Sequence, residues 1–240
     1  MGITRGPNIV TDGLVFMADA ANPSSYPGSG TAWNDLTTNE NHGTLTNGPT
    51  FNSGNSGYID FDGTNDIAIF GSSNLLTGDN CQAATLCSWV KWTSTGRSYI
   101  ASIKRSASDS TLMSISVNQT TGGTESTGYA AIVTRNAANS AHIYTSYDGD
   151  YDDGVWHNVV GRVSGVNVTI YVDGIARAES TDGMQSVTGN TATFTIGGFS
   201  LSDSIFQLNG DVAQVSFYRR AISDSEILQN YNALKGRFGL

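Results

Sequence analysis

The stretch that decides the fold runs from Val155 to Ser180 and reads V-W-H-N-V-V-G-R-V-S-G-V-N-V-T-I-Y-V-D-G-I-A-R-A-E-S. Its apolar residues recur at every second position, a period that is typical of half-buried strands. Ser164-Gly165 and Asp173-Gly174 interrupt the alternation and suit tight hairpin turns. The stretch therefore predicts a three-stranded antiparallel meander whose valine-rich face must be covered by another layer. The residues expected on that face are Val155, His157, Val159, Gly161, Val163, Val166, Val168, Ile170 and Val172.

The composition fits one large β domain. The chain has 240 residues, a length at which all-β sandwiches commonly remain a single domain. Its 28 glycines and 14% charged residues indicate many short strands joined by turns, and 38% hydrophobic residues are enough for a core. Strand-like stretches recur along the whole chain and no βαβ unit is present, so we expect antiparallel sheets.

Two local patterns give more specific expectations. Tyr58–Gly63 and Asp66–Phe70 read as a hairpin, with the turn around Gly63-Thr64-Asn65. Ala83–Trp92 reads as a strong strand, in which the spacing of Trp89 and Trp92 places their side chains on opposite faces.

One clear helix is predicted near the end of the chain. Ser223-Asp-Ser-Glu226 has the pattern of a capping box, which satisfies free N–H groups of the first helical turn. An apolar stripe at helical spacing follows, and Gly236 is suited to end the helix. The stripe consists of Ile227, Leu228, Tyr231 and Leu234. We expect it to pack on its own domain, with binding of a partner as the alternative. The fold class is thus all-β, a two-sheet antiparallel jelly-roll sandwich with one short C-terminal amphipathic helix.

The N-terminus differs from the rest. Met1–Asp12 is polar and has no period, so we interpret residues 1–12 as an arm and residues 13–240 as the domain. The arm is either a docking segment or a disordered terminus. It lacks the basic start and apolar run of a signal peptide. Cys81 and Cys87 would lie about 20 Å apart on a strand, too far for a disulfide, so free thiols are expected.

The charge balance disfavours two classes of partner. Lys and Arg number 12 against 21 Asp and Glu, which gives a net charge of -9. Binding to nucleic-acid phosphates needs clustered basic residues, so a nucleic-acid partner is not expected. No apolar stretch approaches the length of a membrane span, so a membrane partner is not expected either.

Five motifs spread over most of residues 13–240 carry a family resemblance. They are Trp156-His-Asn-Val-Val160, Val168-Thr-Ile-Tyr-Val-Asp-Gly174, Phe61-Asp-Gly-Thr-Asn-Asp66, Ile196-Gly-Gly-Phe199 and the closing stretch Leu208–Ser223. Together they resemble the laminin-G-like and pentraxin-like branch of the concanavalin A-like lectin/glucanase domains. The resemblance implies a two-sheet jelly roll but no particular activity, because the fold hosts lectins, hydrolases and interaction modules.

A narrower resemblance concerns the two ends of the chain. Its segments are Gly6–Val15, Asp19–Gly30, Gly43–Phe51 and Asn230–Leu240. They are similar to a group of proteins encoded by tailed phages, marine ones especially. The resemblance implies a virion component on the head surface or the tail, assembled in the host cytoplasm.

Catalytic patterns are largely missing from the sequence. Glucanases of the family place Glu and Asp at alternate positions of one strand, and here only Glu226 has an acidic residue, Asp224, two positions away, within the predicted start of the helix. Asp60 and Asp62 share a strand face and form a conceivable acid pair, although carboxylates flanking a turn are the simpler interpretation. The three histidines lack the spacing of a zinc site. We therefore predict that the chain is not an enzyme.

Calcium is the one cofactor that the sequence suggests. Asp148, Asp150 and Asp152 alternate in the densest acidic run, and hard cations prefer several such oxygens. A solvated acidic turn is the alternative. Tyr147 and Tyr151 flank the run and are candidates to stack on a sugar, or else to cover the rim of the sheets.

Three functions follow in order of preference. The first is a non-enzymatic virion structural or decoration protein that contacts other virion proteins through the arm or one rim and forms homo-oligomers. The second is a calcium-assisted module that binds a host-surface glycan. The third is a glycan hydrolase.

Overall fold

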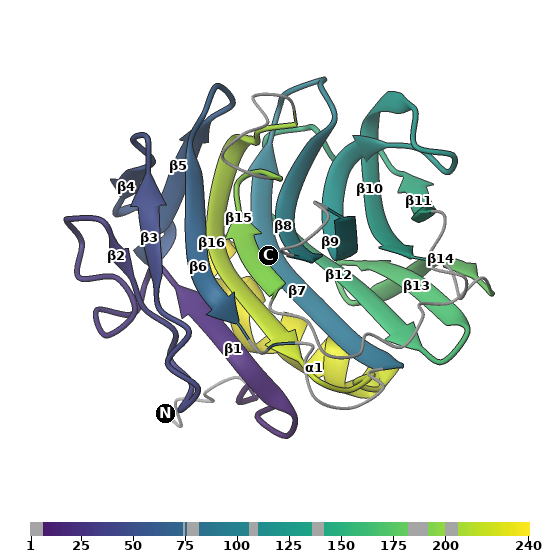
Figure 1. Ribbon diagram of the computed structural model, residues 1–240, viewed down its shortest axis with the longest axis horizontal. Coiled ribbons are helices and arrows are strands. Elements are labelled where there is room, and N and C mark those ends of the chain that lie inside the picture. The colour runs from purple at the N-terminus through teal and green to yellow at the C-terminus, as the bar shows by residue number, and fades with distance from the viewer. Residues whose placement is uncertain are drawn as a thin grey trace.

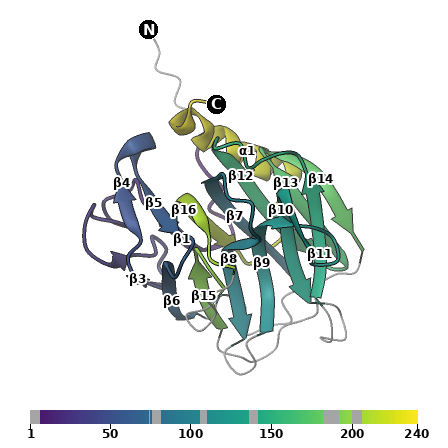
Figure 2. The ribbon, with the colours of Figure 1, turned by 90° about the horizontal axis from the view of Figure 1, so that it is seen from above.

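The computed structural model describes residues 7–73, 75, 82–105, 110–135, 142–181, 192–199 and 206–240. These residues form two antiparallel sheets, A and B, packed face to face, with one α-helix on the outer side of sheet A (Figures 1 and 2). The predicted jelly-roll sandwich with a short C-terminal helix is confirmed. No described helix is long and apolar enough to cross a bilayer.

Each sheet has eight strands. Sheet A has the order β14-β13-β12-β7-β16-β5-β4, and β1 pairs with the second half of β16. Its strands are β1 Leu14–Asp19, β4 Thr50–Asn52, β5 Tyr58–Asp62, β7 Ala83–Trp92, β12 His157–Ser164, β13 Asn167–Val172, β14 Ile175–Ser180 and β16 Asn209–Tyr218. Sheet B has the order β11-β10-β9-β8-β15-β6-β3-β2. Its strands are β2 Ala32–Trp33, β3 Gly43–Thr46, β6 Ile67–Ser73, β8 Ser98–Arg105, β9 Ser110–Gln119, β10 Glu125–Arg135, β11 His142–Asp148 and β15 Ala192–Ile196.

The predicted meander is confirmed as β12-β13-β14. Asp173 and Gly174 have φ values of 55° and 78°, which fit the two-residue turn that matches the twist of a hairpin. The valine-rich face is buried between the sheets, but two of its expected members lie outside the strands. Val166 sits in the first turn and is 65% exposed, and Val155 precedes β12 and is 44% exposed.

Aromatic side chains join the two sheets. The ring of Phe16 on β1 meets Phe70 on β6 and Phe194 on β15 edge-on, at centroid distances of 4.9 and 4.7 Å. Trp92 belongs to this inner core, whereas Trp89 packs on the outer side of sheet A, as their spacing predicts. Sheet A is therefore apolar on both faces along β7.

The hairpin predicted for Tyr58–Phe70 does not form. β5 pairs with β4 and β16 in sheet A, whereas β6 pairs with β3 and β15 in sheet B. The connecting turn thus carries the chain between sheets, and Asp66 closes it by accepting the N–H of Asp62 at 3.1 Å. The prediction was wrong because alternation reveals two strands without revealing which neighbours they pair with.

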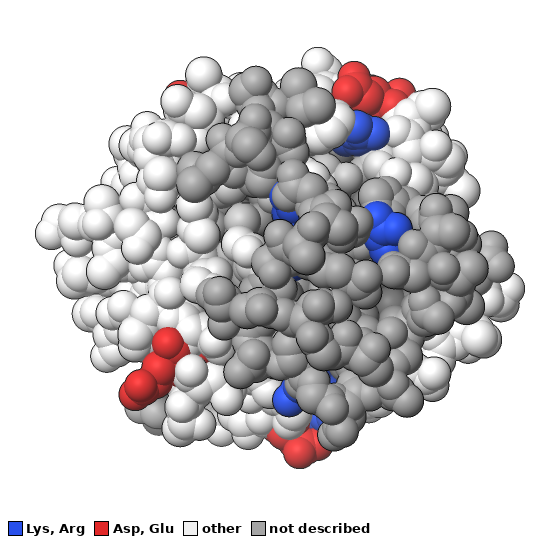
Figure 3. All heavy atoms as spheres, in the orientation of Figure 1, with Lys and Arg blue, Asp and Glu red and all other residues white. Residues whose placement is uncertain are grey.

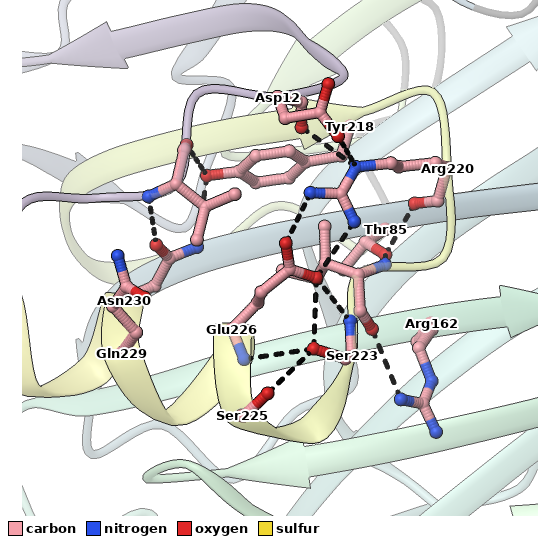
Figure 4. A network of polar contacts seen from close by, with 12 residues as sticks. Asp12, Thr85, Arg162, Tyr218, Arg220, Ser223, Ser225, Glu226, Gln229 and Asn230 are labelled. Atoms are coloured by element: carbon pink, nitrogen blue, oxygen red, sulfur yellow. Dashed lines mark hydrogen bonds and ion pairs between the residues drawn. The ribbon is translucent and has the colours of Figure 1, made fainter.

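The helix α1 (Asp224–Leu234) begins at the predicted capping box (Figure 4). Ser223 Oγ accepts the N–H of Glu226, and the Glu226 carboxylate accepts the N–H of Ser223. A 3-10 turn (η2, Lys235–Phe238) follows, and Gly239 ends it with φ 79°, so Gly236 is not the final residue. The apolar stripe covers the outer face of sheet A through Ile227, which is buried, while Leu228 is 45% exposed.

The described part of the arm lies against this helix. Val10 is buried, its N–H donates to Asn230 Oδ1 at 2.8 Å, and its carbonyl accepts the Tyr218 hydroxyl at 2.8 Å (Figure 4). The amide of Gln229 donates to the carbonyl of Asn8 at 2.8 Å. Residues 8–10 are thus held to the domain, while residues 1–6 lie outside the described residues. The division into an arm and a domain stays a prediction.

Glu226 makes the start of α1 sensitive to acid. Two hydrogen bonds from Arg220, at 2.8 and 2.6 Å, together with the Ser223 N–H lower the pKa of Glu226 from 4.5 to about 2. Because the folded pKa lies below the unfolded one, this carboxylate stabilises the fold above about pH 4.5 and loses that contribution as the pH falls toward 2.

Replacing Glu226 by Gln is therefore expected to lower the free energy of unfolding by about 1 kcal/mol at neutral pH. The same variant should differ little from the wild type near pH 2, where the wild-type carboxylate is itself becoming protonated. Urea unfolding at the two pH values measures the difference. Glu179→Gln, on the exposed edge of β14, is the control; equal losses for Glu226→Gln at both pH values would contradict the linkage.

Candidate functional site

Three neighbouring strands of sheet A bring charged side chains into one row. Asp211 on β16 stands opposite Asp60 on β5 and also opposite Lys91 on β7. Side chains directly opposite one another on adjacent strands interact closely. Lys91 Nζ lies 2.6 Å from Asp211 Oδ2. The row therefore combines two carboxyl groups with one ammonium group.

The surroundings raise the pKa values of Asp211 and Lys91. Burial raises the pKa of Asp211; the hydrogen bond from Lys91 lowers it in part, and a hydrogen bond with Asp60 raises it again, so the net change is upward. Burial lowers the pKa of Lys91, but its bond to Asp211 outweighs that effect and the net change is again upward. Lys91 thus stays charged, with Asp211 as its ion-pair partner and Asp60 opposite Asp211 on the next strand.

The row lines a hollow of about 280 Å³, which we call the Asp211 hollow. The remaining lining residues are Trp92, Thr93, Gly154, Asn209 and Gly210. Asn209 is exposed, and its side-chain amide has no hydrogen-bond partner in the described part of the chain. Gly210 allows β16 to approach β7 closely at this point, because a Cβ there would lie 2.6 Å from the carbonyl oxygen of Lys91. The Lys91 ammonium also lies near the rings of Tyr58 and Trp156, 5.1 and 5.4 Å from their centroids.

A second hollow, the Arg97 hollow, has a volume of about 360 Å³ and shares Asn209 with the first. Its other lining residues are Gly63, Ser94, Gly96, Arg97, Ser98, Glu125, Phe206 and Gln207. Gly63 comes from the turn between β5 and β6, and the others come from the β7–β8 loop, the starts of β8 and β10 and the segment before β16. The two hollows are therefore neighbours on one rim of the sandwich.

The acidic run predicted to bind calcium begins at Asp148, the last residue of β11, and continues on the loop before β12; Gly154 at its end borders the Asp211 hollow. Asp148 and Asp150 are exposed, and Asp152 is half-buried. No group of three or more His, Cys, Asp or Glu side chains placed to hold a metal ion occurs among the described residues. The described carboxylates thus do not converge on one point, and the calcium site stays a prediction.

His157 ties the same loop to the sheet. Its Nδ1 lies 2.9 Å from Asp173 Oδ2, and its Nε2 lies 3.3 Å from Asp153 Oδ1. Burial lowers the pKa of His157, but the two carboxylates outweigh burial and raise it. The acidic run is thus anchored through Asp153, while His157 is a core histidine with both ring nitrogens satisfied.

The two tyrosines proposed to stack on a sugar are occupied in other ways. Tyr151 is 7% exposed and belongs to the core between the sheets, 4.9 Å from the ring of His157. Tyr147 is half-buried against that core, and the guanidinium of Arg177 lies 5.5 Å from its ring centroid. These positions match the alternative interpretation, in which the tyrosines cover the rim.

Sequence reasoning found one member of the charged row and missed the others. Asp60 and Asp62 do share a strand face, but Asp62 accepts the N–H of Thr64 at 2.8 Å within the turn. The partner of Asp60 is instead Asp211, across the strands. A signal for Lys91 was available, because it is the one charged residue in the strand Ala83–Trp92.

Basic side chains on the face shown in Figure 3 lie as separate spots over the described part of that surface. They do not merge into a broad basic patch there. This distribution agrees with the net charge of -9.

The comparisons with known proteins agree with the observed fold. A family model described as the concanavalin A-like lectin/glucanases superfamily matches residues 53–228. No curated protein matches the chain. Among solved structures, a sialidase of Trypanosoma rangeli in complex with sialic acid is similar at a TM-score of 0.68 and 17% identity, over 97% of this chain and 35% of that one. The binding domain of Paraclostridial Mosquitocidal Protein 1 is similar at 0.66 and 16%, over 92% and 52%.

This chain thus spans about a third of the sialidase and about half of the toxin fragment. At such low identity these likenesses show the fold alone. The family model covers well over half of the chain and includes the meander, β5, β7 and the beginning of α1. The chain therefore belongs to the concanavalin A-like lectin/glucanase superfamily.

Proposed function

We propose that this chain is a non-catalytic carbohydrate-binding domain and that the Asp211 hollow is where the sugar binds. The observation that carries the proposal is the row of Asp60, Asp211 and Lys91 beside the free amide of Asn209. Carboxylates accept hydrogen bonds from sugar hydroxyls, an ammonium donates them, and an amide does both. At about 280 Å³ the hollow is slightly smaller than common ligand pockets, which begin near 300 Å³, so it suits a small part of a glycan.

The fold supports this proposal without deciding it. The superfamily hosts both lectins and hydrolases, so the side chains of the site must distinguish them. One similar structure is named as a binding domain and another as a sialidase holding sialic acid. Those names describe those proteins, and for this chain they favour contact with a glycan only in general terms.

The pairing of Asp211 with Lys91 argues against hydrolysis. Glycosidases use two carboxyl groups, separated by about 5–5.5 Å or about 6.5–9.5 Å, that both act on the glycosidic bond. Asp211 stands opposite Asp60 but is already paired with the Lys91 ammonium at 2.6 Å. We propose that the pair holds a sugar hydroxyl and does not cleave.

The test is a glycan array followed by calorimetry with the best ligand. Asn209→Ala is expected to weaken binding about tenfold, because a buried sugar hydroxyl loses its partner. Asn167→Ala, an exposed asparagine where β13 begins, at the opposite end of the sheet, is the matched control and should bind normally. Failure of every glycan to bind would reject the proposal. Loss of hydrolysis in Asp60→Asn would instead establish an enzyme.

A second form of the same proposal is that calcium assists the binding of the glycan. If it assists binding, removing it with a chelator should weaken the glycan affinity, and replacing Asp148, Asp150 and Asp152 by Asn should do the same. Unchanged affinity in both cases would reject the calcium-assisted form and leave carbohydrate binding intact.

We further propose that the domain is displayed on a tailed-phage particle as a structural or decoration protein, as homo-oligomers. The similarity of both chain ends to tailed-phage proteins supports this. Mass spectrometry of purified virions should detect the chain, and light scattering of the pure protein should show an oligomer. Particles that lack the chain would reject the virion role, and a monomer would reject self-association.

A further inference from the structure

The guanidinium of Arg97 has unused donors in the Arg97 hollow. Its Nη1 donates to the carbonyl of Gly123 at 2.6 Å, while its Nε is buried and has no hydrogen-bond partner among the described residues. No carboxylate forms an ion pair with Arg97 among the described residues. The hydroxyl of Ser94, in the same wall, is also buried and unpartnered. Buried polar groups without partners are uncommon, so they call for a missing acceptor.

The guanidinium is held in a fixed plane. Its carbon lies 3.7 Å from the centroid of the Phe206 ring, so the guanidinium rests against that ring. Phe206 has φ 72°, an unfavourable backbone conformation for a bulky residue. The N–H of Tyr99 holds it in place by donating to the Phe206 carbonyl at 3.1 Å. A planar donor edge of fixed orientation matches the two oxygens of a carboxylate.

From these contacts we infer that the Arg97 hollow takes the carboxylate of an acidic sugar, a uronic acid, within the glycan whose neighbouring part lies in the Asp211 hollow. This inference rests on the proposed function. Asn209 lines both hollows, so one saccharide reaches both. Glu125, which is exposed, lines the same hollow and opposes the anion by its charge. Arg97 therefore produces a preference for sugars that carry a carboxylate, and the negative charge of Glu125 weakens that preference.

The experiment uses the full chain and four sugars: galacturonate, glucuronate and the methyl ester of each. NMR titration of backbone amides gives the affinities and locates the binding. We expect the free acids to bind about tenfold more tightly than the esters, with shifts at Gly96 and Gly123. Arg97→Gln should abolish that preference, so that the free acids bind no more tightly than the esters. Glu125→Gln should increase the preference.

The other outcomes distinguish failure of this inference from failure of the proposed function. Equal binding of acids and esters by the wild type would overturn the inference and leave carbohydrate binding standing. A preference for the free acids that survives in Arg97→Gln would also overturn the inference, because another cation such as Lys91 then binds the carboxylate. Binding of none of the four sugars, together with an empty glycan array, would reject the proposed function itself. Arg97→Lys is a second variant that guards against unfolding of the loop. It keeps the charge but lacks the planar guanidinium, and a full acid preference there would also overturn the inference.

Discussion

Replacing Trp89 by alanine is expected to lower the free energy of unfolding by about 3–5 kcal/mol, the usual cost of removing a fully buried tryptophan side chain. Trp89 has no exposed surface, and its ring stacks on Phe238 at 4.3 Å and on Tyr231 at 5.6 Å. These three rings attach α1 and η2 to sheet A. Their loss should therefore also release the helix that holds residues 8–10.

Chemical denaturation measures the stability, and hydrogen exchange in α1 measures the release. Leu228→Ala is the control on the same helix; its side chain is 45% exposed, so the cost should stay within about 0.5 kcal/mol. If Trp89→Ala costs no more than this control, the C-terminal cover does not stabilise the sandwich. Unchanged exchange in α1 despite a large loss of stability would show that the helix is held by other contacts.

The meander could be predicted because its information is local. Alternating valines and Asp173-Gly174 determine strands and turn within a few residues, and the capping box at Ser223 determines the start of α1 in the same way. The pairing of β5 and β6 could not be predicted, since it depends on β16 and β15, more than a hundred residues away. Alternation identifies a buried face, but not the sheet to which a strand belongs.

The candidate site was less predictable for a related reason. Asp60, Lys91 and Asp211 stand far apart in the chain and become neighbours only through the register of three strands. The acidic run at Asp148 was conspicuous because its charges are adjacent in sequence, yet adjacency on a loop does not make carboxylates converge. Tyr151 looked like a surface aromatic beside that run, although the fold places it in the core.

The second large effect is expected at Asn118, whose side chain holds the loop that carries Arg97. Its amide donates to the carbonyls of Ser94 and Gly96, at 2.5 and 3.1 Å, and its oxygen accepts the N–H of Gly128 at 3.0 Å. The residue is fully buried with φ 56°, a conformation that Asn tolerates better than most residues. Asn118→Ala removes three hydrogen bonds and adds backbone strain, so we expect a loss of about 3–5 kcal/mol.

The same change should weaken uronate binding more than ester binding, because Ser94 and Gly96 no longer hold Arg97 in place. Asn118→Gly separates the cost of the lost hydrogen bonds from the cost of the backbone strain. Glycine loses the same hydrogen bonds but accepts the positive φ, so this variant should be about 1 kcal/mol more stable than Asn118→Ala. Denaturation and the NMR titration are run on both variants. A loss below about 1 kcal/mol in Asn118→Ala would mean that the loop is held by its own backbone. Arg97 would then owe its orientation to the Phe206 ring and to its hydrogen bond with the Gly123 carbonyl, and Phe206→Leu should reduce the preference for the free acid.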